Sequence, residues 1–90
     1  MTDNTEQIRL VKQAVRGNPE AYGKLISEYQ EYLYKMAFLY MKNKEDALDL
    51  VGATVLKGYQ NIRQTKKPQW FKTWLTRILI NLAGDAPKNA

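Results

Sequence analysis

The sequence contains no cysteine and no histidine. Disulfide bonds, Cys/His zinc sites, Ser-His-Asp triads and cysteine nucleophiles are therefore excluded, because each of them needs one of these two residue types. The remaining residues offer no convergent set of acid, base and nucleophile. We therefore expect a protein that is not an enzyme and that needs no cofactor and no metal.

Long apolar runs are also missing. No stretch approaches the roughly 20 apolar residues that span a bilayer. The polar start, Met1-Thr-Asp-Asn-Thr-Glu-Gln7, lacks the basic and apolar parts of a signal peptide. A cytoplasmic protein without membrane insertion is expected. The chain has 90 residues, 44% of them hydrophobic, which suits one modest core, since domains usually run to roughly 100–200 residues.

Acidic residues are absent between Thr54 and Gly84, and the whole chain has a formal net charge of +5. The basic residues of this stretch are Lys57, Arg63, Lys66, Lys67, Lys72 and Arg77. This distribution predicts a surface for a polyanion. Acids gather just before it, at Glu45, Asp46 and Asp49, which indicates a second surface for a different partner. The plainer interpretation is that both are ordinary solvated helix faces.

Apolar periodicity and capping residues predict an all-α bundle of about four helices without strands. A short first helix ends at Gly17. Asn18 as N-cap and Pro19 at the first helical position begin a second helix, which runs to about Met41. Its apolar positions follow a period of 3.6 residues. They are Tyr22, Leu25, Ile26, Tyr29, Leu33, Met36, Ala37 and Tyr40.

A third helix is predicted from about Lys44 to Asn61, with Asn43 as its N-cap. An advance of 100° per residue separates a core side from an outer side. The core side has Ala47, Val51, Thr54, Val55, Gly58 and Ile62, and the outer side has Glu45, Asp46, Asp49, Ala53, Leu56 and Gln60. An acidic end with a leucine in the middle is typical of a docking surface, although single exposed leucines are common.

The fourth helix is predicted from about Pro68 to Leu82, after a basic loop at Arg63–Lys67 and with Gly84 as its cap. Its predicted core face contains Phe71, Trp74, Leu75, Ile78 and Leu82. One edge has Trp70, Arg77 and Asn81, and the outer side has Thr73, Thr76 and Ile80. The tail is expected to fray.

Four segments together resemble region two of the extracytoplasmic-function sigma factors of bacterial RNA polymerase. They are Gly17-Asn-Pro-Glu-Ala21, Asn43-Lys-Glu-Asp-Ala-Leu-Asp-Leu-Val51, Leu56-Lys-Gly-Tyr-Gln-Asn-Ile62 and Trp70-Phe-Lys-Thr-Trp-Leu-Thr-Arg-Ile78. They occur in the order and spacing of that family. The resemblance implies one sigma region-two domain at residues 1–85, with a disordered tail at residues 86–90.

The resemblance also implies two partners, core RNA polymerase and the melted minus-ten promoter element. In that family the third helix docks on a coiled coil of the largest polymerase subunit. The matching positions here are Asp46, Asp49, Gly52, Ala53 and Leu56. The basic loop and fourth helix would hold a base flipped out of the non-template strand, with Arg63, Lys66, Lys67, Trp70, Lys72, Thr73, Arg77 and Asn81 as candidates. An anti-sigma factor is a further partner that the resemblance allows.

The residue types suit single-stranded promoter DNA. Lys and Arg bind phosphates, and each base stacked on an aromatic ring contributes roughly 1–3 kcal/mol. Extraction of a base costs a few kcal/mol, which contacts to the base edge must offset, and Asn can form paired hydrogen bonds there. Alternatives stay open, since Asn81 is also a plausible helix-capping residue, Trp74 is expected mainly to pack, and Trp70 suits either role.

Two departures from the family pattern bear on function. Gly52-Ala53 stands where the family usually has a Gln-Glu pair that serves the polymerase contact. This keeps an alternative open, namely an interaction-only module such as a split co-sigma subunit or an anti-sigma-binding decoy. The helix-turn-helix region that follows in the family is not present. The chain is therefore expected to be an excised domain or half of a split sigma factor.

Overall fold

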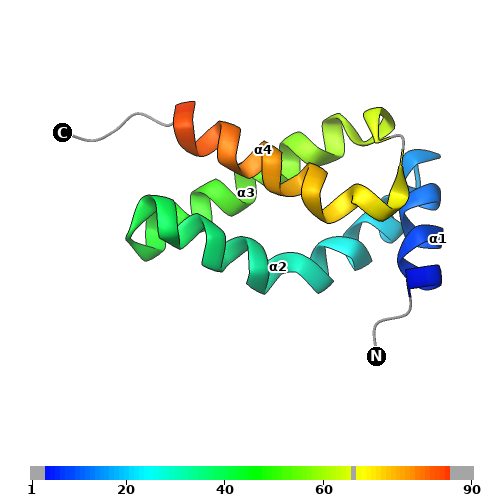
Figure 1. The fold of residues 1–90 in the computed structure, drawn as a ribbon, viewed down its shortest axis with the longest axis horizontal. Coiled ribbons are helices and arrows are strands. Elements are labelled where there is room, and N and C mark those ends of the chain that lie inside the picture. The colour runs from blue at the N-terminus through cyan, green and yellow to red at the C-terminus, as the bar shows by residue number, and fades with distance from the viewer. Residues whose placement is uncertain (1–3, 66, 86–90) are drawn as a thin grey trace.

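The computed structural model describes residues 4–65 and 67–85. Within these ranges the chain forms four α-helices and two 3-10 helices, and no strand (Figure 1). They are α1 (Asn4–Val15), α2 (Pro19–Met41), α3 (Lys44–Gln60), η1 (Ile62–Gln64), η2 (Pro68–Trp70) and α4 (Phe71–Asp85). The predicted all-α fold is confirmed. The predicted tail at residues 86–90 lies outside the described residues.

The turn between α1 and α2 follows from three adjacent residues. Gly17 has a φ of +101°, a conformation that glycine adopts at little steric cost. Asn18 then caps α2, because its Oδ1 accepts the backbone N–H groups of Glu20 at 3.0 Å and Ala21 at 3.3 Å. Pro19 occupies the first helical position, where no backbone donor is needed. The predicted helix start is confirmed.

Asn43 begins α3 through a reciprocal pair of hydrogen bonds with Asp46. Its Oδ1 accepts the backbone N–H of Asp46 at 2.9 Å, and its Nδ2 donates to the Asp46 carboxylate at 2.8 Å. The carboxylate also lies at the positive end of the helix dipole. The predicted N-cap is confirmed, and these two hydrogen bonds fix the first turn of α3.

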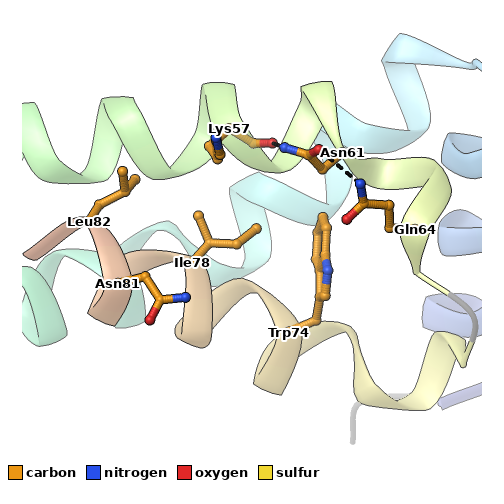
Figure 2. A pocket seen from close by; sticks show the side chains of 7 residues that line it. All are labelled: Lys57, Asn61, Gln64, Trp74, Ile78, Asn81 and Leu82. Carbon is orange, nitrogen blue, oxygen red and sulfur yellow. Dashed lines mark hydrogen bonds between the residues drawn. The ribbon is translucent and has the colours of Figure 1, made fainter. Parts of the chain in front are cut away.

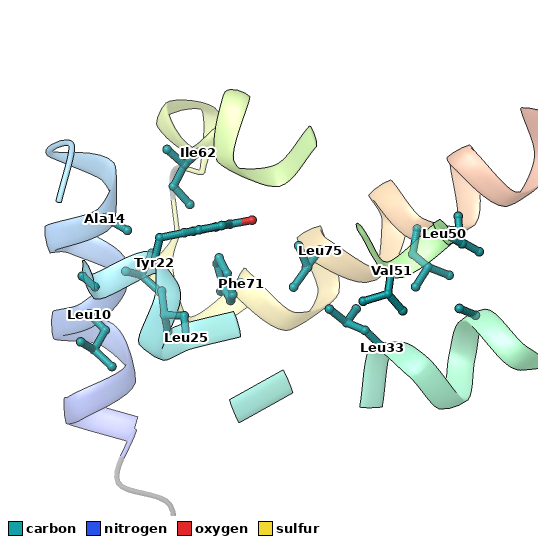
Figure 3. Packing of buried hydrophobic residues seen from close by; sticks show 14 of the residues in the cluster. Leu10, Ala14, Tyr22, Leu25, Leu33, Leu50, Val51, Ile62, Phe71 and Leu75 are labelled. Carbon is teal, nitrogen blue, oxygen red and sulfur yellow. The ribbon is translucent and has the colours of Figure 1, made fainter. Parts of the chain in front are cut away.

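The helices α2, α3 and α4 lie alongside one another, and α1 crosses one end of this group (Figure 1). Apolar side chains from all four meet in a single core (Figure 3), and the larger fully buried ones include Val11, Leu25, Leu33, Phe71, Leu75 and Leu79. Tyr29 packs on Phe71 with ring centroids 5.8 Å apart, which joins α2 to α4. No described helix is long and apolar enough to cross a membrane.

Tyr22 joins α2 to the C-terminal half of α3. Its hydroxyl donates to the backbone carbonyl of Val55 at 2.7 Å, and its ring lies 5.2 Å from that of Tyr59. The residue is 5% exposed, and this burial raises the pKa of its phenol. Burial, with a smaller effect of Glu28, also raises the pKa of Tyr29.

The predicted bounds of the fourth helix are wrong at both ends. Residues 68–70 form η2, and the α-helix begins at Phe71. It continues through Gly84 to Asp85, because Gly84 keeps a helical backbone conformation instead of the positive φ that ends many helices. Within the predicted loop, residues 63 and 64 belong to η1, and Thr65 is buried.

The predicted core faces of α3 and α4 are partly wrong. Leu50 and Leu79 are buried, although neither was expected in the core. Val55 and the outlying members of the α4 face, Trp74, Ile78 and Leu82, are only partly buried. The difference arises because α4 packs against both α3 and α2, which centres its buried face on Leu75.

Candidate functional site

A basic hollow of about 320 Å³ lies at the junction of η2 and α4. It is lined by Lys67, Trp70, Thr73, Trp74 and Arg77. The last four of these recur at helical spacing, so they share one flank. Trp70 is 55% exposed. The structure thus brings together four of the eight predicted DNA-binding residues, with two cations and no acid among them.

A second hollow of about 250 Å³ opens between the end of α3 and α4 (Figure 2). Its lining residues are Lys57, Asn61, Gln64, Trp74, Ile78, Asn81 and Leu82. The Asn61 amide donates to the Lys57 carbonyl at 2.9 Å and accepts from Gln64 Nε2 at 3.2 Å. In Figure 2 the indole of Trp74 stands between α4 and this amide pair. The hollow therefore combines an aromatic ring with amide groups.

Trp74 lines both hollows. Its ring lies 5.8 Å from that of Phe71 and packs against the core, so the predicted packing role is confirmed. The sequence did not indicate that the same ring also forms a wall of both hollows. The spacing of four residues between Trp70 and Trp74 could have indicated that both rings lie on one flank of the helix. Asn61 and Gln64 were also missed, because side chains at a helix end are usually assigned to capping.

Asn81 lies on the second hollow, together with Trp74, and is exposed. It is four residues before the end of α4, so it is a residue of the last turn and not the cap that the alternative interpretation expected.

Two other predicted DNA-binding residues lie apart from these hollows. Lys72 is on the flank of α4 that faces α2, where its Nζ is 4.3 Å from the centroid of the Tyr32 ring. Thr76, one turn further on, hydrogen-bonds the Tyr32 hydroxyl at 2.9 Å. Arg63 lines a third hollow at the end of α1, beside Val15. Lys66 lies outside the described residues.

The outer face of α3 presents four of the five residues predicted to bind polymerase. Asp49, Gly52, Ala53 and Leu56 are exposed. Leu48 is 50% exposed and Leu56 is 59% exposed. Leu48 was not predicted, although its spacing of four from Gly52 and eight from Leu56 puts it in the same row. Asp46 differs, since it is partly buried and its carboxylate is bound to Asn43.

Gly52 lies between Leu48 and Leu56 in this row and has no side chain. A Cβ atom at this position would meet no other atom within 4 Å, apart from those of its neighbours and its own helix. Packing inside the chain therefore does not require glycine at this position.

The chain is similar to known sigma factors. Residues 25–89 match the family described as Sigma-70 region 2. The chain is 33% identical over 60 residues to RNA polymerase sigma factor SigV of Bacillus subtilis, which covers 67% of this chain and 36% of SigV. It is 28% identical over 75 residues to the ECF sigma factor SigW of the same organism, covering 83% of this chain and 40% of SigW.

A third relative extends the match to nearly the whole chain. The ECF sigma factor BldN of Streptomyces coelicolor is 29% identical over 90 residues, which covers 99% of this chain and 34% of BldN. The chain thus spans 34 to 40% of the length of these three curated relatives. No solved structure matches it.

Proposed function

Because the chain belongs to the sigma-70 region 2 family, we propose that it acts in transcription initiation by binding core RNA polymerase and the melted minus-ten promoter element. The similarity to ECF sigma factors confirms the predicted resemblance to region two of that group. The observation that supports the DNA-binding part best is the pair of adjoining hollows that share Trp74.

The hollow at the start of α4 suits the backbone of a single DNA strand. Lys67 and Arg77 offer cations for phosphates, and the exposed ring of Trp70 offers a stacking surface. Stacking on an aromatic ring contributes roughly 1–3 kcal/mol per base. This surface would therefore bind single strands with a strong dependence on salt.

The hollow between α3 and α4 suits a base turned out of that strand. The indole of Trp74 offers a stacking surface, while Asn61, Gln64 and Asn81 offer amide donors and acceptors for the base edge. Such edge contacts would offset the few kcal/mol that extraction of a base costs. Asn61 is already engaged by Lys57 and Gln64, so Asn81 is the reader whose side chain is freest to turn toward a base.

Fluorescence anisotropy with minus-ten oligonucleotides, varied one base at a time, tests this proposal. The chain should prefer one base at one position. Asn81→Ala should relax that preference by about 1–3 kcal/mol, which is the usual worth of one paired side-chain contact to a base. Equal affinity for all oligonucleotides would contradict base capture.

Arg77→Gln and Lys72→Gln form a matched pair on the same helix. Arg77 lines the basic hollow, whereas Lys72 lies over Tyr32 on the other flank. Arg77→Gln should weaken binding of all sequences alike and flatten the salt dependence. Lys72→Gln should leave the affinity and its salt dependence nearly unchanged. Equal losses in the two variants would show that the strand does not follow the proposed flank.

The outer face of α3 is the proposed contact with the largest polymerase subunit. Two exposed leucines flank the bare backbone at Gly52, and Asp49 adds an acid beside them. Apolar anchors with a polar rim are typical of protein interfaces. Capture of core polymerase by the immobilised chain, without DNA, would support this contact.

A second function is an interaction-only module that does not read promoters. The exposed Gly52-Ala53 pair favours it, since the family usually has Gln-Glu there. A chain that captures polymerase only after Gly52→Gln and Ala53→Glu, and that binds all oligonucleotides equally, would support this alternative. Capture by the unchanged chain would support an interface rebuilt around small residues.

A further inference from the structure

The third hollow, at the end of α1, has no part in the proposed function. It has a volume of about 180 Å³ and is lined by Tyr59, Gln60 and Arg63, together with small and apolar residues of α1, η1 and the turn after α1. In Figure 1 the end of α1 lies beside η1. The lining combines an aromatic ring, an amide and a guanidinium, with no acid among them. These are the groups that bind the bases and phosphates of single strands.

Tyr59 presents a ring that is exposed and at the same time supported. The residue is 43% exposed, and its ring centroid lies 5.2 Å from that of Tyr22. Tyr22 is itself fixed, because it is buried and its hydroxyl donates to the Val55 carbonyl at 2.7 Å. A ring held in this way loses little freedom when a base stacks on it, which favours binding.

The two polar side chains of the hollow have no partner in the parts of the chain that the structure describes. Asn61 and Gln64 are hydrogen-bonded to each other at 3.2 Å. Gln60 and Arg63, which alternate with them along the chain, are exposed and form no hydrogen bond or ion pair through their side chains within residues 4–65 and 67–85. Their amide and guanidinium groups are therefore available to a ligand.

We propose that Tyr59, Gln60 and Arg63 form a second nucleotide site on the promoter strand. It holds the nucleotide next to the base that the hollow between α3 and α4 receives, here called the captured base. The Tyr59 ring stacks on the second base, Gln60 meets its edge, and the Arg63 guanidinium binds two phosphate oxygens in its fork geometry. The proposal rests on the proposed function, because it needs a strand that is already bound.

The two sites adjoin at the end of α3. Gln60 lines the third hollow and Asn61 lines the hollow of the captured base. These residues are consecutive, so their Cα atoms are about 3.8 Å apart. Arg63 and Gln64 are divided between the two hollows in the same way. A strand that places one base beside Asn61 can therefore place the next base against Tyr59.

Oligonucleotides that lack a single base test the second site without any change to the 90-residue chain. In fluorescence anisotropy, removal of the captured base and removal of one neighbouring base should each weaken binding roughly fivefold or more, which is the worth of one stacked base. Exchange of one base for another should matter at the captured position and little at the neighbouring one, because every base has a face for stacking. Loss of affinity at the captured position alone would overturn the second site.

Tyr59→Leu identifies the ring that receives the neighbouring base. It should weaken binding of the intact strand roughly fivefold or more and have no further effect on the strand that already lacks this base. Tyr59→Phe keeps the ring and should restore most of the affinity. Tyr40→Leu is the matched control, since Tyr40 is 48% exposed on α2 and lines none of the hollows described above. Equal losses on the two strands would overturn the assignment to Tyr59.

Arg63→Gln tests the phosphate contact. It should weaken binding of all oligonucleotides alike, roughly threefold to tenfold, and lower the salt slope by about 0.7. Lys24→Gln is its control, because Lys24 is exposed on α2 and lines none of these hollows. Equal losses in the two variants would contradict a phosphate at Arg63.

Failure of the second site is distinguishable from failure of the proposed function. If the chain prefers one base at the captured position but tolerates removal of both neighbouring bases, only the second site is overturned. If the chain binds no oligonucleotide, the proposed function fails and the second site fails with it.

Discussion

Two glycines of α3 lie on different sides of the helix and have different reasons to be glycine. Gly58 is buried, and a Cβ there would lie 2.6 Å from the Tyr22 hydroxyl and 3.1 Å from Leu75 Cδ1. Gly52 is exposed, and a Cβ there would meet no other atom within 4 Å beyond its own helix and neighbours. The chain itself excludes a side chain at the first position and not at the second.

This difference separates the parts of α3 that hold the fold from those that are free for a partner. The inner side is determined by contacts with α2 and α4, such as the Tyr22 hydrogen bond to Val55. The outer side combines Gly52 with exposed leucines, and no contact within the chain explains why it lacks a larger residue. The proposed contact with polymerase would account for it.

Gly58→Ala should cause the largest loss of stability. Because Tyr22 is buried and bonded to Val55, its ring cannot move aside without loss of that hydrogen bond. Overpacking of this kind typically costs about 1–3 kcal/mol. Urea denaturation followed by circular dichroism measures the change. A free energy of unfolding equal to that of the unchanged chain would mean that the inner side of α3 is loosely packed.

Tyr22→Phe should have a smaller effect, which depends on pH. Loss of the hydrogen bond to Val55 should lower the free energy of unfolding by about 1 kcal/mol at neutral pH. Burial raises the pKa of Tyr22 in the folded chain. Its contribution is therefore complete below about pH 10, the usual tyrosine pKa, and is lost as the pH rises further.

The pH dependence of the free energy of unfolding provides the control for the Tyr22→Phe prediction. The unfolded chain releases the Tyr22 proton above about pH 10 while the folded chain keeps it, so stability should fall by up to about 1.4 kcal/mol per pH unit. Tyr29, whose pKa is also raised by burial, remains in both proteins. The unchanged chain should therefore lose stability more steeply than Tyr22→Phe. Parallel pH profiles would contradict a buried, protonated Tyr22.

The starts of α2 and α3 were predictable from the sequence, and the sides that the helices bury were less so. Asn18 and Asn43 act through hydrogen bonds to residues two or three positions away, so local sequence suffices. The burial of Leu50 and Leu79 depends on how α4 lies across α2 and α3. That contact joins distant segments, and helical periodicity does not determine it.

The candidate site, like the fold, was predictable from the sequence only in its local features. Trp70, Thr73 and Arg77 share a helix flank, and their spacing indicated this. Lys72 has the same charge and is only five residues from Arg77, yet it lies over Tyr32 of α2. Composition groups these cations together, but five residues along a helix put them about 140° apart, and the packing of α4 directs the Lys72 side toward α2.

Gly52→Ala should stabilise the chain, in contrast to the same change at Gly58. Within a helix, alanine is favoured over glycine by roughly 0.5–1 kcal/mol, and the position has open space. If a partner approaches the bare backbone closely, the same variant should bind core polymerase less well. Thermal unfolding and polymerase capture would then change in opposite directions. A destabilised Gly52→Ala would remove the distinction between the two glycines.

Leu56→Ala should change stability least, because the side chain is 59% exposed. Exposed substitutions usually alter the free energy of unfolding by no more than about 0.5 kcal/mol. Binding should respond more, since truncation of an apolar anchor at the centre of an interface typically costs more than about 1 kcal/mol. Ile80→Ala is the control, as Ile80 is 40% exposed on α4. If core polymerase is captured equally by both variants, the outer side of α3 is solvated surface, and the bare backbone at Gly52 serves no partner there.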